Sequence, residues 1–143
     1  MTNTIQCDIV SAKESIFSGK VAMVIASGVS GELGIAPRHA PLMTTLKPGP
    51  VRVLMPEGEE IIFVAGGGIL EVMPHMVTVL ADMIVRADDL DEAAAIRAKE
   101  DAERILQTRT SEMEFAEAHA KLMEAIMQLQ AMERLRKMSK HKR

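Results

Sequence analysis

Residues 51–81, VRVLMPEGEEIIFVAGGGILEVMPHMVTVLA, place apolar side chains at every second position of several short runs. A period of two is typical of β-strands, because successive side chains point to opposite faces of a sheet. Turn-forming residues separate the runs at Pro56 to Gly58, at Gly66 to Gly68 and at Pro74. The alternating apolar positions are Val51, Val53 and Met55, then Ile61, Phe63 and Ala65, then Val77, Val79 and Ala81.

The same pattern extends toward the amino terminus, so residues 1–86 are expected to form an all-β sandwich or barrel. Further turns are expected at Ser18-Gly19, between Gly28 and Gly34, and at Pro48 to Pro50. All nine Gly and all six Pro of the chain lie in this part. Its remaining alternations are Ile5, Cys7 and Ile9, and Val21, Met23 and Ile25.

Residues 87–143 lack Gly and Pro and are rich in Ala, Glu, Arg, Leu, Met and Gln, which favours helices. Four acids within residues 88–92 suit the start of a first helix, and a break is expected near residues 107–110. Ser111 and Glu114 have the spacing of a capping box that opens a second helix. A short joint predicts an antiparallel two-helix hairpin, so the fold class is α+β with two domains, residues 1–86 and 87–143.

An apolar seam with three- and four-residue spacing runs along both expected helices. Its first-helix part is mostly alanine, so the helices can approach closely while burying little area. Because burial contributes about 25 cal/mol per Å² of apolar surface, such a hairpin is expected to dock marginally and to open. The seam residues are Ala95, Ala98, Ala102 and Ile105, then Phe115, Ala118, Leu122, Ala125, Leu129 and Met132.

The carboxyl terminus is strongly basic, although the chain as a whole has a net charge of -3. Residues 134–143 carry six Lys or Arg and no acid. One interpretation is a solvated tail that complements the helix dipole. The other is an electrostatic latch, formed by Arg134, Arg136 and Lys137, for an acidic partner surface.

No catalytic, cofactor or metal site is expected. The four His residues are scattered, Cys7 is the only cysteine, and the glycine clusters do not match a phosphate-binding loop. The acidic pair Glu59-Glu60 flanks a turn and is expected to be solvated. The net charge, three Phe and absence of Trp and Tyr argue against nucleic-acid binding. With no signal-like segment and no apolar run of about 18 residues, a soluble cytoplasmic protein without membrane insertion is expected.

Several motifs in register resemble the epsilon subunit of F-type ATP synthases over nearly the whole chain, most closely its proteobacterial form. In the first half these are Phe17-Ser-Gly19, Gly31-Glu-Leu-Gly-Ile35, His39-Ala-Pro-Leu42 and Leu46-Lys-Pro-Gly49. Further on they are Gly67-Gly-Ile-Leu-Glu-Val72, Val77-Thr-Val-Leu-Ala-Asp82, Leu90-Asp-Glu-Ala93 and Glu124-Ala-Ile-Met-Gln-Leu129.

The resemblance implies a sandwich of about ten strands and a helical hairpin, in a rotor-stalk subunit with no active site. It implies binding to the gamma subunit and the c-subunit ring, on the cytoplasmic side of the inner membrane, in a complex driven by protons. It also implies that the extended hairpin contacts the alpha and beta subunits and inhibits ATP hydrolysis. The family's contact region corresponds here to Glu32, Gly34, His39, Pro41 and Leu42.

Some relatives bind ATP through an I/L-D-x-x-R-A motif at the start of the hairpin. Here Leu90 and Asp91 match, but Ala94 occupies the arginine position. Arg97 lies three residues further, about 300° round a helix. Since a guanidinium is the group that would hold phosphate, weak or no ATP binding is expected by calorimetry.

Two other classes of function fit the residues. One is a β-sandwich adaptor with a helical arm, unrelated to ATP synthase. The other is a small ligand-binding or enzymatic β-domain with a hairpin that dimerises through residues 115–132. A pull-down distinguishes all three, because only the epsilon-subunit interpretation requires binding to gamma and the c-ring.

Overall fold

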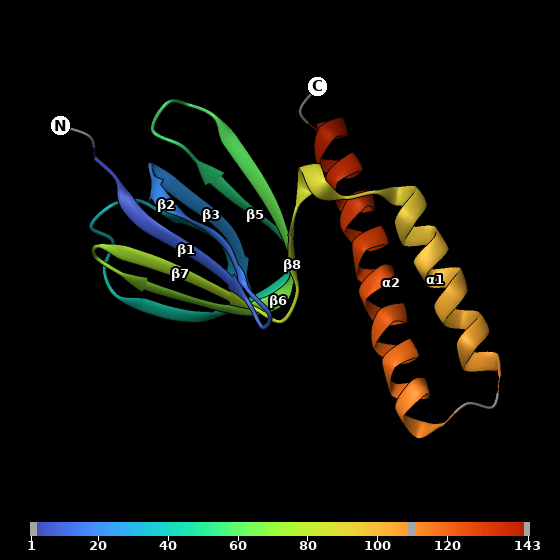
Figure 1. Cartoon of the computed structure of the whole chain (residues 1–143). Coiled ribbons are helices and arrows are strands. Elements are labelled where there is room, and N and C mark those ends of the chain that lie inside the picture. The colour runs from blue at the N-terminus through green and yellow to red at the C-terminus, as the bar shows by residue number, and fades with distance from the viewer. Residues whose placement is uncertain (1–2, 109–110, 142–143) are drawn as a thin grey trace. The chain divides into compact units, whose positions relative to one another are not determined.

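The computed structural model describes residues 3–108 and 111–141, with side chains up to Lys137. The chain divides into two compact units (Figure 1), Met1–Asp89 and Leu90–Arg143. The first unit consists of strands and the second of two helices. No helix in the described part of the chain is both long and apolar enough to cross a membrane.

The strand unit forms a sheet in the order β2-β1-β7-β6-β5-β3-β4, with β8 paired to β6. Neighbouring strands are antiparallel except β1 and β7, which are parallel. A single turn of 3-10 helix, Ala87–Asp89, follows the last strand. The strands are β1 Ile5–Ser11, β2 Ser15–Val21, β3 Met23–Gly28, β4 Gly31–Ile35, β5 Leu42–Leu54, β6 Glu60–Met73, β7 Met76–Ala81 and β8 Ile84–Arg86.

The sheet folds over on itself because β5 and β6 are long enough to belong to both layers. Residues 42–46 of β5 pair with the end of β6, which also pairs with β7. Residues 51–54 pair with the start of β6 and with β3. Buried side chains of β1 and β7 join those of β3 and β5 in one core, although these strand pairs are not neighbours in the sheet. The result is the expected β-sandwich.

The expectation of about ten strands is wrong, since the described residues form eight. The expected turns at Pro48 to Pro50 and Gly66 to Gly68 lie inside β5 and β6. These segments pair with each other, Pro48 with Gly66 and Pro50 with Val64. The turn formers therefore bend two continuous strands instead of ending them.

The prolines of β5 are tolerated because of an irregularity in its pairing with β3. The register jumps from Ala26–Val51 to Gly28–Leu46, so residues 47–50 have no β3 partner in the described register. Proline cannot donate a ladder hydrogen bond and is found where none is needed. The local mismatch thus accommodates both prolines and bends the strand.

The core follows most of the predicted alternations. Ile5, Cys7 and Ile9 are buried, as are Val77, Val79 and Ala81. Burial raises the pKa of the Cys7 thiol to about 12, with a smaller contribution from Asp8. The set Val21, Met23 and Ile25 is wrong in phase, because β2 ends at Val21 and the new strand places Val24 and Ala26 in the core. A one-residue shift moves every side chain of a strand to the other face.

The helical unit consists of α1, Glu92–Gln107, and α2, Glu112–His141. The Asp91 carboxylate accepts a hydrogen bond from the Ala94 N–H at 3.1 Å and caps α1. At α2, the Ser111 hydroxyl accepts one from the Glu114 N–H at 3.3 Å, as the capping box predicts. The predicted break begins after Gln107, and Arg109 and Thr110 lie outside the described residues. Most of the expected basic tail is part of α2.

Replacing Gly68 with Ala is expected to destabilise the strand unit by about 3 kcal/mol or more. Gly68 has φ +153°, and a Cβ atom there would lie 2.1 Å from the Leu80 carbonyl oxygen. Because the chain has no Trp or Tyr, labelling of the buried Cys7 thiol during urea unfolding is a suitable measurement. The control is Gly34→Ala, whose Cβ meets only Met23 Sδ at 3.9 Å and which should be nearly neutral. Equal urea midpoints for Gly68→Ala and Gly34→Ala would contradict the close approach of the backbone at Gly68 to Leu80.

Candidate partner interfaces

The first candidate surface is the outer face of β4, an edge strand of the sheet. Glu32 and Gly34 are exposed, whereas Ile35 is buried in the core. In the register with β3, Glu32 lies opposite Ser27 and Gly34 opposite Ile25. Glycine at 34 leaves the backbone open to close approach by a partner.

A charged pair lies on the same outer face. Arg52 of β5 lies opposite Ile25, and its Nε donates a hydrogen bond to Glu60 Oε1. That hydrogen bond raises the pKa of Arg52, burial lowers it, and the charges of Glu60 and Glu32 raise it further. Glu60 is therefore not simply solvated, as the sequence suggested, and Glu32 lies within the electrostatic field of Arg52.

The turn after β4 is fixed by backbone hydrogen bonds. Arg38 adopts φ 64°, and its N–H donates to the Pro74 carbonyl at 3.0 Å. Its guanidinium also reaches Asn3 Oδ1 at 3.5 Å. His39 Nδ1 lies 2.7 Å from the Ala40 carbonyl oxygen, which can only accept, so Nδ1 carries the proton. This leaves Nε2 of the half-buried ring as the atom available to a partner.

The five predicted interface residues are not all on one strand face. Glu32 and Gly34 belong to β4, in the layer that contains β3. Leu42 begins β5 and pairs with Val72 of β6, in the other layer, where it packs against the core. His39 and exposed Pro41 lie in the connection between the layers. The segment thus extends from Glu32, near the bend of β5 at residues 46–50, to Leu42 at the start of that strand.

A larger apolar surface, which sequence reasoning missed, covers the outside of β5, β6 and β7. We call it the outer apolar face. Ile69 pairs with Leu80, and Met73 with Met76, while Met43 pairs with Glu71. The signal was present in the runs ILEVM and MVTVL, which are apolar on the core face and, apart from Glu71 and Thr78, on the outer face as well. The outer apolar face consists of Met43, Ile69, Met73, Met76 and Leu80, with exposed fractions of 37% to 67%.

The helical unit contains the predicted seam, built mainly from alanine. Four seam residues are buried, and within each helix they are seven positions apart. This spacing keeps them on one helix face. Three larger residues of α2, Leu122, Leu129 and Met132, are half-buried. The four are Ala95 and Ala102 of α1 and Ala118 and Ala125 of α2, and Ala131 of α2, which was not predicted, is buried as well.

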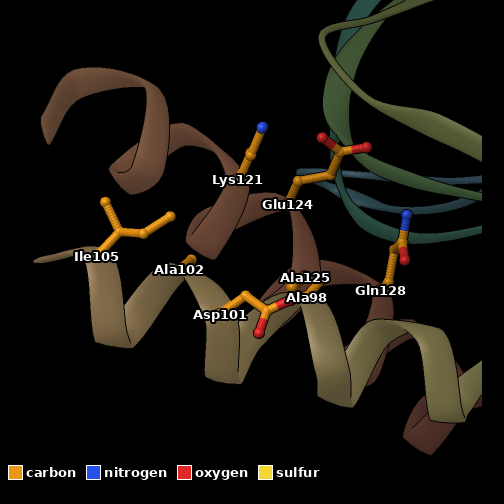
Figure 2. Close-up of a pocket in the computed structure, with 8 residues that line it drawn as sticks. All are labelled: Ala98, Asp101, Ala102, Ile105, Lys121, Glu124, Ala125 and Gln128. Carbon is orange, nitrogen blue, oxygen red and sulfur yellow. The ribbon is translucent and has the colours of Figure 1, made fainter. Parts of the chain in front are cut away.

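Three predicted seam residues are exposed. Ala98 and Ile105 line an open groove of about 420 Å³ between the helices (Figure 2). Alanine methyl groups are too short to fill this space, so both stay accessible. Phe115 is half exposed and stacks on His119, with ring centroids 6.3 Å apart. It lies in the first turn of α2.

Figure 2 shows where the groove changes from apolar to polar. Ala98, Ala102 and Ala125 lie where the two helices meet, whereas Lys121, Glu124 and Gln128 extend from α2. Asp101 lines the α1 side, and its carboxylate pairs with Arg104 on the same helix. The alanine floor gives the seam little apolar area. At about 0.8 kcal/mol per buried methyl-sized group, the five buried alanines of the described helices contribute about 4 kcal/mol.

The three predicted latch residues lie near the end of α2 and are exposed. Lys137 lies 3.8 Å from Glu133, one turn earlier on the same helix. Arg136 instead pairs across the hairpin, its Nη2 lying 2.7 Å from Glu92 Oε2. Arg134 is exposed on the same helix.

Comparison with known proteins identifies the family. Residues 4–87 match the sequence model described as "ATP synthase, Delta/Epsilon chain, beta-sandwich domain". Residues 88–139 match "ATP synthase, Delta/Epsilon chain, long alpha-helix domain". The ATP synthase epsilon chain of Stenotrophomonas maltophilia (strain K279a) is 60% identical over 97% of this chain and 99% of its own length. The chain belongs to the ATP synthase epsilon-chain family.

Other relatives and solved structures agree with this assignment. The ATP synthase epsilon chain of Xylella fastidiosa (strain Temecula1 / ATCC 700964) is 54% identical, with the same coverage. A chain of the Euglena gracilis mitochondrial ATP synthase has a TM-score of 0.63 at 21% identity, covering 94% of this chain and 80% of that one. The latter likeness concerns the fold. As an epsilon-family chain, the protein is a non-catalytic subunit of ATP synthase.

In this epsilon-family chain Asp91, the acid of the degenerate ATP motif, has a structural role. The Asp91 carboxylate caps α1 by accepting from the N–H of Ala94, the residue that replaces the expected arginine. Capping satisfies one of the free N–H groups at a helix start. The Leu90-Asp91 pattern is thus explained without a nucleotide, and weak ATP binding stays a prediction.

Filling the groove is expected to stabilise the folded hairpin. Ala98→Leu would place a larger apolar side chain on the alanine floor, and we expect a gain of about 1 kcal/mol. Thermal unfolding followed by helical circular dichroism measures it. Ala93→Leu is the matched control, because Ala93 is exposed on α1 outside the groove. A gain no larger than the control's would show that the groove is not available to side chains.

Proposed function

We propose that the chain is a central-stalk subunit of a proton-driven ATP synthase that couples rotation of the c-ring to ATP synthesis. Its strand unit binds the gamma subunit and the c-subunit ring, and its helical unit inhibits ATP hydrolysis. It acts as a peripheral protein on the cytoplasmic side of the inner membrane. Residues 1–86 supply the binding function and residues 87–143 the regulation.

The observation that carries the proposal is the outer apolar face. Five large apolar side chains are exposed together on three neighbouring strands. Large apolar side chains exposed together on one face, here around Glu71 and Thr78, suit a protein interaction site. Family membership supports gamma as the occupant, since an epsilon chain must hold its place in a rotating assembly.

We assign contact with the c-ring to the segment from Gly31 to Leu42, which carries Glu32, Gly34, His39, Pro41 and Leu42. Glu32 offers a carboxylate on an edge strand, and Gly34 offers exposed backbone. The His39 ring is oriented by its hydrogen bond to the Ala40 carbonyl, which leaves Nε2 as the nitrogen that could accept from a partner. Charged and polar groups on a fixed turn provide specificity in place of large buried area.

We assign regulation to the hairpin. Its alanine seam stabilises the closed form weakly, so a closed and an extended form differ by only a few kcal/mol, as a switch requires. In the extended form Arg134, Arg136 and Lys137 would meet acidic surfaces of the alpha and beta subunits. Electrostatic attraction of this kind depends on salt and on the number of charges.

Placing charge on the outer apolar face tests the proposed function. In Ile69→Glu/Leu80→Glu, two carboxylates face each other across β6 and β7, and we expect co-purification with gamma and the c-ring from detergent-solubilised membranes to be lost. Ile96→Glu, at a similarly exposed apolar position of α1, is the control and should co-purify. Recovery of the double variant in the complex would contradict this assignment. Absence of the unmodified chain from the complex would contradict the function itself.

Removing the latch charges tests the inhibition. The variant Arg134→Ala/Arg136→Ala/Lys137→Ala should assemble normally and raise ATP hydrolysis by about fivefold, because the charges that attract the acidic partner surface are removed. The matched control Arg97→Ala/Lys99→Ala/Arg104→Ala removes the same charge from α1. Equal hydrolysis by the latch variant and the unmodified complex would exclude the latch.

A further inference from the structure

The ion pair between Glu92 and Arg136 differs from the other ion pairs of the helical unit. Among the described residues, the pairs Lys99–Glu103, Asp101–Arg104 and Glu133–Lys137 each lie within one helix. Of the ion pairs between described side chains, Glu92–Arg136 is the one that joins α1 to α2, with Nη2 and Oε2 2.7 Å apart. It therefore forms only when the hairpin is closed.

The position of the Glu92–Arg136 pair suits a contact that keeps the hairpin closed. Glu92 is the first residue of α1, while the two helices are connected at the other end, between Gln107 and Glu112. The free ends of a hairpin separate furthest when it opens, so a bond between them restrains opening most. The alanine seam beneath it contributes little area, which makes a single charged contact a significant part of the closing free energy.

The same guanidinium belongs to the proposed latch. Arg136 reaches Glu92 only in the closed hairpin, whereas the proposed contact with an acidic partner surface belongs to the extended form, so the two contacts exclude each other. Both side chains are more than half exposed, so the pair can exchange readily with solvent or a competitor.

We propose that the Glu92–Arg136 ion pair is a clasp that keeps the hairpin closed and withholds Arg136 from the catalytic subunits. The two carboxylate environments compete for one guanidinium, which makes closure and inhibition mutually exclusive. This inference rests on the proposed inhibitory function. In this inference Arg136 closes the hairpin when paired and inhibits hydrolysis when released, whereas Glu92 only closes the hairpin.

The two partners of the clasp should therefore behave alike in the isolated chain and differently in the complex. Glu92→Gln and Arg136→Gln each remove the pair, and each should increase the open fraction about two- to fivefold. Spin labels attached through Glu100→Cys and Gln130→Cys, at exposed positions of α1 and α2, measure this fraction in the full chain. Glu103→Gln is the control, since Glu103 pairs only within α1, with Lys99 at 4.0 Å.

In the assembled complex, Glu92→Gln should lower ATP hydrolysis by a similar factor, because Arg136 is released with its charge intact. Arg136→Gln should not lower it. Open fractions of both variants equal to that of Glu103→Gln would overturn the clasp. A different result would be increased opening of both variants with hydrolysis unchanged in Glu92→Gln. It would overturn the inhibitory function and the competition for Arg136, while the ion pair would remain a contact that closes the hairpin.

Discussion

The alanine contact between α1 and α2 sets how firmly the helical unit can close. Ala95 and Ala102 of α1 and Ala118, Ala125 and Ala131 of α2 are buried along one seam, and an open groove remains beside it. Alanine favours the helix itself, so each helix can persist when the seam separates. The sequence thus stabilises two helices strongly and their association weakly. A hairpin of this kind can serve as a switch because its closed form is easily exchanged for another.

The strand unit is built in the opposite way. Its core is filled mainly by branched and aromatic side chains from all eight described strands, including Ile9, Val53, Phe63 and Val79. The bend at Gly66 to Gly68 lets β5 and β6 serve both layers, and at Gly68 the backbone passes too close to Leu80 for any side chain. This continuity holds the outer apolar face and the turn at Arg38 in fixed positions. The tightly packed strand unit thus carries the proposed binding surfaces, and the weakly closed helical unit carries the proposed regulation.

Much of this organisation could be predicted from the sequence, because local patterns decide it. Period-two alternation identified most core strands, and the acids and Ser111 identified both helix starts. The turn formers at Pro48 to Pro50 led to a wrong prediction of a turn, because whether they end or bend a strand depends on pairing with distant residues of β6. The outer apolar face was missed because an apolar run on both strand faces does not say which face meets a partner. The pair Glu92–Arg136 joins residues on separate helices, and only the hairpin brings them together.

Hydrogen exchange of the isolated full chain tests the contrast between the two units most directly. Exchange free energies report local opening, and they reach the global value only in the most stable elements. We expect amides of α1 and of the first half of α2 to exchange with opening free energies about 3 kcal/mol or more below those of β1, β6 and β7. Equal protection of the helices and the core strands would contradict the account, since the hairpin would then be no more ready to open than the sandwich.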